Sequence, residues 1–398
     1  MKKIPNRQVH LDFHTSEMID QVGSKFSAEE FADTLKNANV EAVTLFTRCH
    51  HGNLYYDSTK YPERIHPHLK VKDMYREQAK ECRKKGIKVY LYTTICWDIR
   101  VAAEHPEWVA IDDYARISRR ETGNIFEDPG FHVDLCINSP YREFCKEQIA
   151  DALENCPVDG VLVDASFVVE CCCPRCRKSM LEKHLNPADP QDRKKHAWQI
   201  YYDFVREMTD YLHEIDSDYD IFFNKGHVGA QDIPVRDCFD YVAVESQPAN
   251  CGYMDFPVSA RYLRTWGVPV VGMTGRFLTG WGDNNSYRNQ AALEYESFSA
   301  LSYGGLCNIG DQLPPSGQLD KDMYGFRQVK EKEPWCEDVT ALSEMAVFNP
   351  EEFYGGAPGT VNPHAEGVCR MLQELGYQYD LVDSESDYSQ YRLLLLAD

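Results

Sequence analysis

The chain lacks the long apolar segments that would place it in a membrane or direct it for export. No stretch approaches the roughly 18 apolar residues of a membrane-spanning helix. The N-terminal segment MKKIPNRQVHLDF contains two lysines but no apolar core, so it predicts no signal peptide.

Positive charge is also scarce. The 42 Lys and Arg residues are outnumbered by 63 Asp and Glu residues, which gives a formal net charge of −21 at pH 7. This balance argues against nucleic acid as a partner, because phosphates attract Lys and Arg, and against anionic membrane surfaces. Neutral small molecules remain suitable ligands. With 43% hydrophobic and 26% charged residues, the composition is that of an ordinary globular protein.

A glycine-rich nucleotide loop and a serine nucleophile elbow are absent as well. Short apolar segments instead alternate with amphipathic ones. Eight of them are predicted as strands: Val9–Phe13, Ala42–Phe46, Lys88–Tyr92, Gly160–Val163, Asp220–Phe223, Tyr241–Val244, Val268–Gly272 and Gly305–Ile309. This count predicts an α/β fold, a (β/α)8 TIM barrel. A doubly wound sheet is the main alternative, and it is disfavoured because no phosphate loop follows the first strand.

The alternating series restarts after about Trp335. Residues 336–398 predict a strand, a helix and two further strands, which we interpret as part of a Rossmann-like α/β domain after a barrel domain of residues 1–335. The chain stops on its last predicted strand, YRLLLLAD, which would leave an unpaired edge and an uncovered apolar face. Either a partner covers this face or the chain is a fragment of a longer protein, and the fragment is favoured.

Two acidic residues stand at the carboxyl ends of predicted strands. Asp164 follows VLV, and Glu245 follows VAV with Pro248 just beyond. Strand ends of a barrel converge on one pocket, where enzymes keep their catalytic carboxylates. Two carboxylates about 5–5.5 Å apart would form a retaining glycosidase pair, and at about 6.5–9.5 Å an inverting pair. The structural alternatives are a helix cap for Asp164 and a rim salt bridge for Glu245.

Polar and aromatic side chains gather at other strand ends. Indole faces stack on sugar rings, while His, Asn and Arg donors orient hydroxyl groups. The candidates for binding a small carbohydrate are His10, Asp12, His14, His50, His51, Trp97, Asn224, His227, Arg276 and Trp281. Each histidine could instead be a buried, hydrogen-bonded core residue. His10, Asp12 and His14 could also hold a metal, as in amidohydrolase barrels, although their spacing is HxDxH rather than HxH.

Cysteine is plentiful, with fifteen residues. Without a predicted secretory signal, so many thiols indicate a cytoplasmic protein whose cysteines stay reduced. Cys136, Cys171, Cys173 and Cys176 supply the four soft ligands of a closed, structural Zn²⁺ site. Cys172 alternates out of this set. Inert buried thiols are the alternative interpretation.

Several motifs together resemble the α-L-fucosidases of glycoside hydrolase family 151, also described as hypothetical glycosyl hydrolase 6. They are HLDFHTSE, TLFTRCHHG, HPEW, LCINSPYR, VDGVLVD, GMTGRF, WGD and GDQLPPSG, spread along the chain from His10 to Gly317. The segment CHHGNLYY and the residues after it also look like family 29 fucosidases. The resemblance implies a retaining α-L-fucosidase in which Asp164 is the nucleophile and Glu245 the acid/base residue.

The cysteine pattern is similar to the zinc site of family 42 β-galactosidases, which Cys136, Cys171, Cys173 and Cys176 match one by one. Residues from about 345 look like the start of the trimerisation domain of those enzymes, which implies a homo-oligomer, a trimer in full-length relatives. The reaction centre departs from that family, because GMTGRF carries no carboxylate. The alternatives to a fucosidase are therefore a β-galactosidase-like hydrolase of another hexose, a metal-dependent hydrolase, or a non-catalytic carbohydrate-binding barrel.

Overall fold

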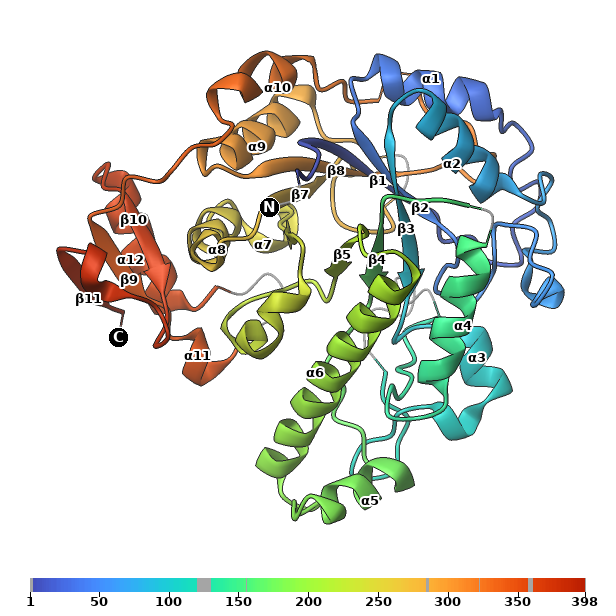
Figure 1. The fold of residues 1–398 in the computed structure, drawn as a ribbon, viewed down its shortest axis with the longest axis horizontal. Coiled ribbons are helices and arrows are strands. Elements are labelled where there is room, and N and C mark those ends of the chain that lie inside the picture. The colour runs from blue at the N-terminus through green and yellow to red at the C-terminus, as the bar shows by residue number, and fades with distance from the viewer. Residues whose placement is uncertain are drawn as a thin grey trace.

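The computed structural model describes residues 3–119, 130–154, 156–283, 286–321, 323–356 and 361–397. Its main sheet has eight parallel strands in the order β5-β4-β3-β2-β1-β8-β7-β6 (Figure 1). They are β1 (Arg7–Asp12), β2 (Ala42–Phe46), β3 (Lys88–Thr94), β4 (Gly160–Asp164), β5 (Asp220–Phe223), β6 (Val242–Glu245), β7 (Val270–Gly275) and β8 (Leu306–Gln312).

The two ends of this order lie side by side. The backbone N–H of Asp240, just before β6, donates to the carbonyl of Ile221 in β5 at 3.1 Å. The first strand pairs with β2 on one side and with β8 on the other, so the sheet curls into a nearly closed barrel. The predicted (β/α)8 TIM barrel is confirmed, and the doubly wound alternative is wrong because its strand order would be different.

Helices surround the strands (Figure 1). They are α1 (Ala28–Asn37), α2 (Met74–Lys84), α3 (Ile99–Glu104), α4 (Tyr141–Leu153), α5 (Pro174–Glu182), α6 (Pro190–Ile215), α7 (Pro248–Cys251), α8 (Asp255–Leu263), α9 (Gln290–Ser302) and α10 (Arg327–Lys332). Short 3-10 helices are η1 (Pro62–Arg64), η2 (Pro106–Trp108), η3 (Ala230–Cys238), η4 (Arg264–Trp266), η5 (Glu333–Trp335) and η6 (Tyr388–Gln390).

Local sequence signals explain where these elements begin and end. The Ser27 side chain accepts from the backbone N–H of Glu30 at 3.4 Å and so caps α1. Gly86 follows α2 with a φ of 73°, a left-handed conformation that costs glycine little. Observed strands agree with the predicted ones to within a few residues. Several run further at their carboxyl ends, because pairing continues into polar residues such as Thr94 and Gln312.

A C-terminal unit follows the barrel, comprising the described residues from 345 to 397. Its three parallel strands, β9 (Met345–Phe348), β10 (Tyr379–Val382) and β11 (Leu393–Leu396), pair in the order β10-β9-β11. The helices α11 (Glu351–Tyr354) and α12 (Pro363–Glu374) complete it. The unit packs beside α8 (Figure 1), where Tyr262 donates its hydroxyl to Asp383 at 2.7 Å and Arg264 contacts Asp380 at 2.8 Å. The division into domains at residue 335 stays a prediction.

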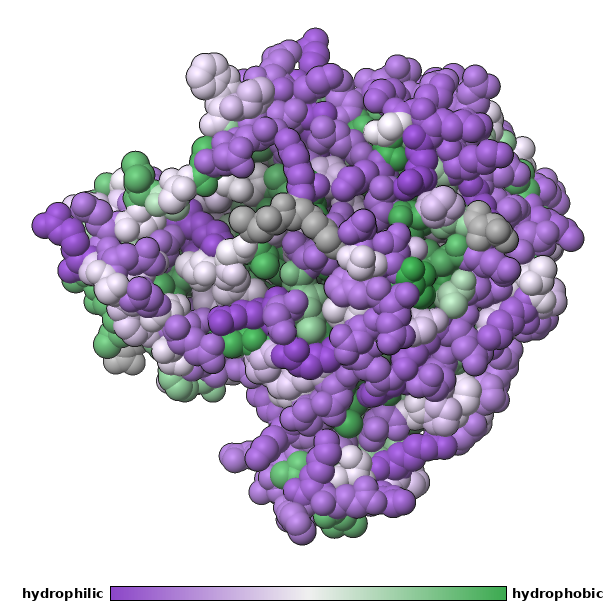
Figure 2. All heavy atoms as spheres, viewed as in Figure 1, coloured by the Kyte–Doolittle hydropathy of each residue, from purple (hydrophilic) through white to green (hydrophobic). Residues whose placement is uncertain are grey.

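The face of the molecule seen in Figure 2 is mostly hydrophilic, with hydrophobic residues in small groups, some along the margin of the C-terminal unit. On β11, Leu393 is 46% and Leu396 is 72% exposed. Among the helices in the described ranges, none combines the length and the apolar composition needed to cross a membrane.

Candidate active site

Asp164 and Glu245 lie at the same end of the barrel and share one hydrogen-bond donor. Asn224 directly follows β5, and its Nδ2 lies 2.8 Å from Asp164 Oδ1 and 3.2 Å from Glu245 Oε2. Because both bonds start from one nitrogen, the two carboxylate oxygens cannot be further apart than the two bond lengths taken together. Both acidic residues are half-buried.

The strand register brings Asn224 to this position. Val163 in β4 pairs with Phe223 in β5, so the residues that follow them also lie side by side. The backbone N–H of Gly226 donates to Asn224 Oδ1 at 3.1 Å. This bond fixes which end of the amide is the acceptor, and it leaves the amide nitrogen to face the two carboxylates.

The Asp164 carboxylate has further polar neighbours on β3 and after β2. The hydroxyl of Tyr92 donates to Asp164 Oδ2 at 2.5 Å, and His50 Nε2 lies 3.8 Å from the same oxygen. Burial raises the pKa of Asp164, while the hydrogen bonds from Tyr92 and Asn224 oppose that rise by stabilising the charged form.

His50 faces Asp164 with the nitrogen that carries no proton. The Thr94 hydroxyl donates to the carbonyl of Trp97 at 3.1 Å, so its oxygen accepts from His50 Nδ1 at 2.8 Å. The proton therefore sits on Nδ1, and Nε2 is an acceptor. Burial, followed by the nearby His14, lowers the pKa of His50 well below its usual value, which keeps the ring neutral.

Asp12 and His14, at the end of β1, form a hydrogen-bonded pair beside this histidine. His14 Nε2 lies 3.0 Å from Asp12 Oδ1, and Gln312 Nε2 donates to Asp12 Oδ2 at 2.8 Å. The His14 and His50 rings stack with centroids 4.0 Å apart. Burial would lower the pKa of His14, but the Asp12 charge outweighs it and raises that pKa to about 10. The backbone N–H of His50 points at His14 Nδ1 at 3.2 Å, and this contact acts against protonation of that nitrogen.

Aromatic rings enclose the other side of the strand ends. Phe46 and Tyr92 stack with centroids 3.6 Å apart, and His10 meets Trp281 edge to face at 5.3 Å. A Cβ at Gly310 would overlap the indole of Trp281, so only glycine leaves room for this ring against β8. Within the described part of the chain, His10 Nδ1 and Trp281 Nε1 are buried without a hydrogen-bond partner. Both atoms could bond to a ligand.

Other candidate side chains are engaged elsewhere. Trp97 packs edge to face on His50 at 5.1 Å but donates its Nε1–H to Asp134 at 3.0 Å. His51 packs against Phe131 at 5.1 Å.

The remaining two candidates join long-range ion pairs. Arg276 bonds to Asp311 at 2.9 Å and to Asp320 at 2.5 Å. His227 Nε2 bonds to Glu351 of the C-terminal unit at 3.0 Å. The structure therefore does not bring Arg276 or His227 into the set around Asp164.

Sequence reasoning missed two members of the set. Tyr92 lies inside an apolar strand, where it looks like a core residue, although it stands two residues before the carboxyl end of β3. Gln312 stands next to Asp311 in the motif GDQLPPSG and pairs in register with Asp12. For both residues, a position close to the carboxyl end of a strand was the sequence feature that could have indicated a place in the site.

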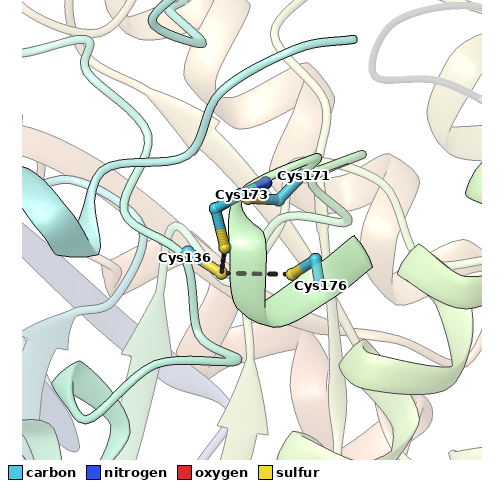
Figure 3. Close-up of side chains that lie close together, drawn as sticks. All are labelled: Cys136, Cys171, Cys173 and Cys176. Carbon is cyan, nitrogen blue, oxygen red and sulfur yellow. Dashed lines mark hydrogen bonds between the residues drawn. The ribbon is translucent and has the colours of Figure 1, made fainter. Parts of the chain in front are cut away.

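The four predicted metal ligands come together in a second site (Figure 3). Their sulfur atoms all lie within 4.8 Å of one another, with Cys136 Sγ 3.9 Å from Cys173 Sγ and 3.5 Å from Cys176 Sγ. A disulfide would need about 2.05 Å. Tetrahedral zinc with bonds of about 2.3 Å would space its sulfurs about 3.8 Å apart. The spacing fits a metal, and Cys172 contributes no sulfur to the group.

The local structure favours thiolates at this site. Cys173 is the N-cap of α5 and Cys176 lies in its first turn, where the helix dipole stabilises negative charge. Asn138 Nδ2 lies 3.5 Å from Cys176 Sγ. Among the described residues, this is the only group of three or more possible ligands close enough to hold a metal ion. The alternative metal site at His10, Asp12 and His14 therefore gains no support.

Comparisons with known proteins agree with this fold. Residues 27–165 match the family described as "Hypothetical glycosyl hydrolase 6". The structure of α-L-fucosidase isoenzyme 2 from Paenibacillus thiaminolyticus is similar, with 33% identity and a TM-score of 0.90 over 98% of this chain and 60% of that chain. A β-galactosidase from the haloarchaeon Halorubrum lacusprofundi is 14% identical, with a TM-score of 0.67 over 98% of this chain and 68% of that chain. No curated protein matches the chain in a sequence comparison.

By fold and by these matches, the chain resembles the glycoside hydrolases. The predicted resemblance to α-L-fucosidases of the hypothetical glycosyl hydrolase 6 type is confirmed. At 14% identity the β-galactosidase shares the fold alone. The chain spans 60% of the length of the Paenibacillus protein.

Proposed function

We propose that the chain is a retaining glycoside hydrolase that cleaves α-L-fucosides. The observation that carries this proposal is the carboxylate pair bridged by Asn224, whose Nδ2 lies 2.8 Å from Asp164 and 3.2 Å from Glu245. The two bridged oxygens are therefore within 6.0 Å of each other. This upper limit is compatible with a retaining pair, whose carboxyl groups are about 5–5.5 Å apart. The similarity to the Paenibacillus α-L-fucosidase supports fucose as the sugar.

In the proposed reaction, Asp164 attacks the anomeric carbon while Glu245 protonates the departing glycosidic oxygen. The bond to the leaving group breaks, and the sugar is held as an ester of Asp164. Glu245, now ionised, takes a proton from water, which attacks the anomeric carbon and releases Asp164. The amide of Asn224 holds both carboxylates in position through these two steps.

The surrounding side chains suit a sugar. His50 Nε2 can accept a hydrogen bond from a hydroxyl next to the reacting carbon, because its proton is on the other nitrogen. His10 Nδ1 and Trp281 Nε1 offer further polar partners.

A variant with Asp164→Ala tests the nucleophile. It should lose most hydrolysis of nitrophenyl α-L-fucoside, on the order of 10³-fold or more in kcat, because no ester can form. Added azide should replace the missing carboxylate as nucleophile and restore part of the rate. The product would then be a glycosyl azide. A panel of other nitrophenyl glycosides would identify the sugar. Full activity in the variant, or no turnover of any glycoside by the unaltered protein, would contradict the proposal.

We also propose Zn²⁺ as the metal of the four-cysteine site, because closed sites of four thiolates are typical of structural zinc. The fifteen cysteines are all free, which supports a cytoplasmic protein. Assembly into a homo-oligomer through the C-terminal unit stays a proposal drawn from the resemblance to trimeric β-galactosidases.

A further inference from the structure

We propose that Glu351, in the C-terminal unit, is a positioning residue for the candidate active site and acts through the loop that carries Asn224. This inference rests on the proposed function. Glu351 begins α11, outside the barrel, yet its side chain reaches the segment that follows β5, residues 224–230. Figure 1 places α11 between the C-terminal sheet and this side of the barrel.

The carboxylate of Glu351 holds two points of the loop. Its Oε1 accepts from His227 Nε2 at 3.0 Å and from the backbone N–H of Ala230 at 3.0 Å. Only 12% of the Glu351 side chain and 15% of the His227 side chain are exposed. Gln231 Nε2 donates to the backbone carbonyls of Glu351 and Glu352, at 3.3 and 3.0 Å. The start of α11 is therefore bonded to this part of the barrel through both a side-chain carboxylate and backbone carbonyls.

Two glycines make room for this contact. A Cβ at Gly229 would overlap Glu351 Oε1, and a Cβ at Gly356 would overlap the His227 ring. The backbone thus approaches the pair closely on both sides, one side belonging to the barrel and the other to the C-terminal unit. An enclosed contact of this kind permits little movement of either partner.

The two groups also stabilise each other's charge. Burial alone would lower the pKa of His227, but the hydrogen bond and charge of Glu351 raise it. Burial alone would raise the pKa of Glu351, but His227 lowers it. Lys225 and Asp232 face the same pair, and they bond to each other at 3.0 Å.

The loop transmits this anchoring to the carboxylates. Gly226, next to His227, donates its N–H to Asn224 Oδ1 and so sets the direction of the amide that faces Asp164 and Glu245. Gly226 has a φ of 78°, a backbone conformation that glycine adopts readily. A loop released at His227 would let this turn shift, and the Asn224 amide would shift with it.

The test compares Glu351→Ala with Glu351→Gln in nitrophenyl fucoside hydrolysis. Alanine removes both hydrogen bonds to the loop, and kcat should fall about 10- to 100-fold, since a displacement of about 1 Å at reacting groups has an effect of that size. KM should change much less. Glutamine keeps an oxygen that can accept from Ala230 and His227, so it should restore kcat to within about threefold of the unaltered protein.

Asp380→Ala is the matched control. Asp380 lies in the same unit, its side chain is also 12% exposed, and it contacts Arg264 of the barrel instead of the loop. Its loss should lower the melting temperature while kcat stays unchanged. A Glu351→Ala kcat within twofold of the unaltered protein, or an equal fall in kcat for Asp380→Ala, would overturn the positioning role.

Hydrogen exchange separates this inference from the proposed function. Amides of residues 224–230 should exchange at least about tenfold faster in Glu351→Ala than in the unaltered protein or in Asp380→Ala. If the unaltered protein hydrolyses no glycoside, the proposed function fails, but the exchange measurement still tests the coupling. Unchanged exchange in this loop would overturn it.

Discussion

Asp164 is a largely buried carboxylate whose charge is supported mainly by hydrogen bonds. Burial raises its pKa, and Tyr92 on β3 and Asn224 after β5 donate to its two oxygens. In the proposed reaction Asp164 must be deprotonated to attack, so activity should be retained above the pKa of Asp164 and lost as pH falls through it. Because that pKa is raised, we expect the acidic limb of the kcat/KM profile at a higher pH than an ordinary aspartate would give.

Replacement of Tyr92 by Phe should move the acidic limb to a still higher pH. Tyr92→Phe removes a donor that stabilises the ionised carboxylate, so the pKa of Asp164 rises and activity at low pH falls first. A hydrogen bond to a charged group is worth about 1.5–3 kcal/mol, which corresponds to a shift of about one pH unit or more. The measurement is kcat/KM for nitrophenyl fucoside against pH.

Tyr90→Phe provides the control on the same strand. Tyr90 lies toward the opposite end of the barrel, and its hydroxyl contacts Asp220 at 3.1 Å. This variant should leave the acidic limb in place. An unmoved limb in Tyr92→Phe would mean that the limb does not report the ionisation of Asp164.

Individual roles at the site could be predicted only in part. Asp164, Asn224 and Glu245 stand at strand ends, which is a local property that the sequence pattern reveals. The partners of His227 and Arg276 depend on contacts with residues far along the chain, Glu351 and Asp311. No local pattern fixes such contacts, since they depend on how whole elements pack.

At the scale of elements, the loop after β4 joins the two sites of the barrel. Asp164 ends β4, and the cysteine pair of α5 follows within a dozen residues. Cys136 ties this loop to the segment before α4. A metal at the four sulfurs would therefore hold two barrel loops together, without touching the carboxylates.

Cys173→Ser tests this structural role. The purified unaltered protein should contain about one zinc per chain, and the variant should lose it, because three thiolates bind the ion less tightly than four. The free energy of unfolding should fall by about 4 kcal/mol or more, while kcat well below the melting temperature stays similar. Metal analysis and thermal unfolding are the measurements.

Cys172→Ser is the corresponding control. Cys172 is equally buried and adjacent in sequence, but its sulfur lies outside the group of four. The zinc content of the Cys172→Ser variant should equal that of the unaltered protein. If both variants keep their zinc, or if both lose it, the assignment of the ligands is wrong.

The elements themselves were the most predictable part of the fold. Strands β2 and β5 have the bounds that were predicted, and Gly86 ends its helix as expected. The cysteine group was predictable because three of its members lie within six residues. The docking of α11 on the loop after β5 was not predictable, because it leaves no mark in the local sequence.

At the scale of the whole molecule, the C-terminal unit is tied to the barrel at separate places. Arg264 and Tyr262 bond to Asp380 and Asp383, and Glu351 bonds to the loop near the carboxylates. The net charge of −21 leaves a neutral sugar unaffected by long-range repulsion. This is compatible with the proposed substrate, an uncharged sugar held by short-range contacts at one end of the barrel.

The anomeric form of the first sugar released tests the central claim most directly. In the proposed reaction, two displacements at the anomeric carbon preserve its configuration. Proton NMR of freshly mixed protein and nitrophenyl α-L-fucoside should show α-L-fucose first, followed by slow mutarotation to the mixture. β-L-Fucose as the first product would contradict a nucleophilic Asp164 paired with Glu245.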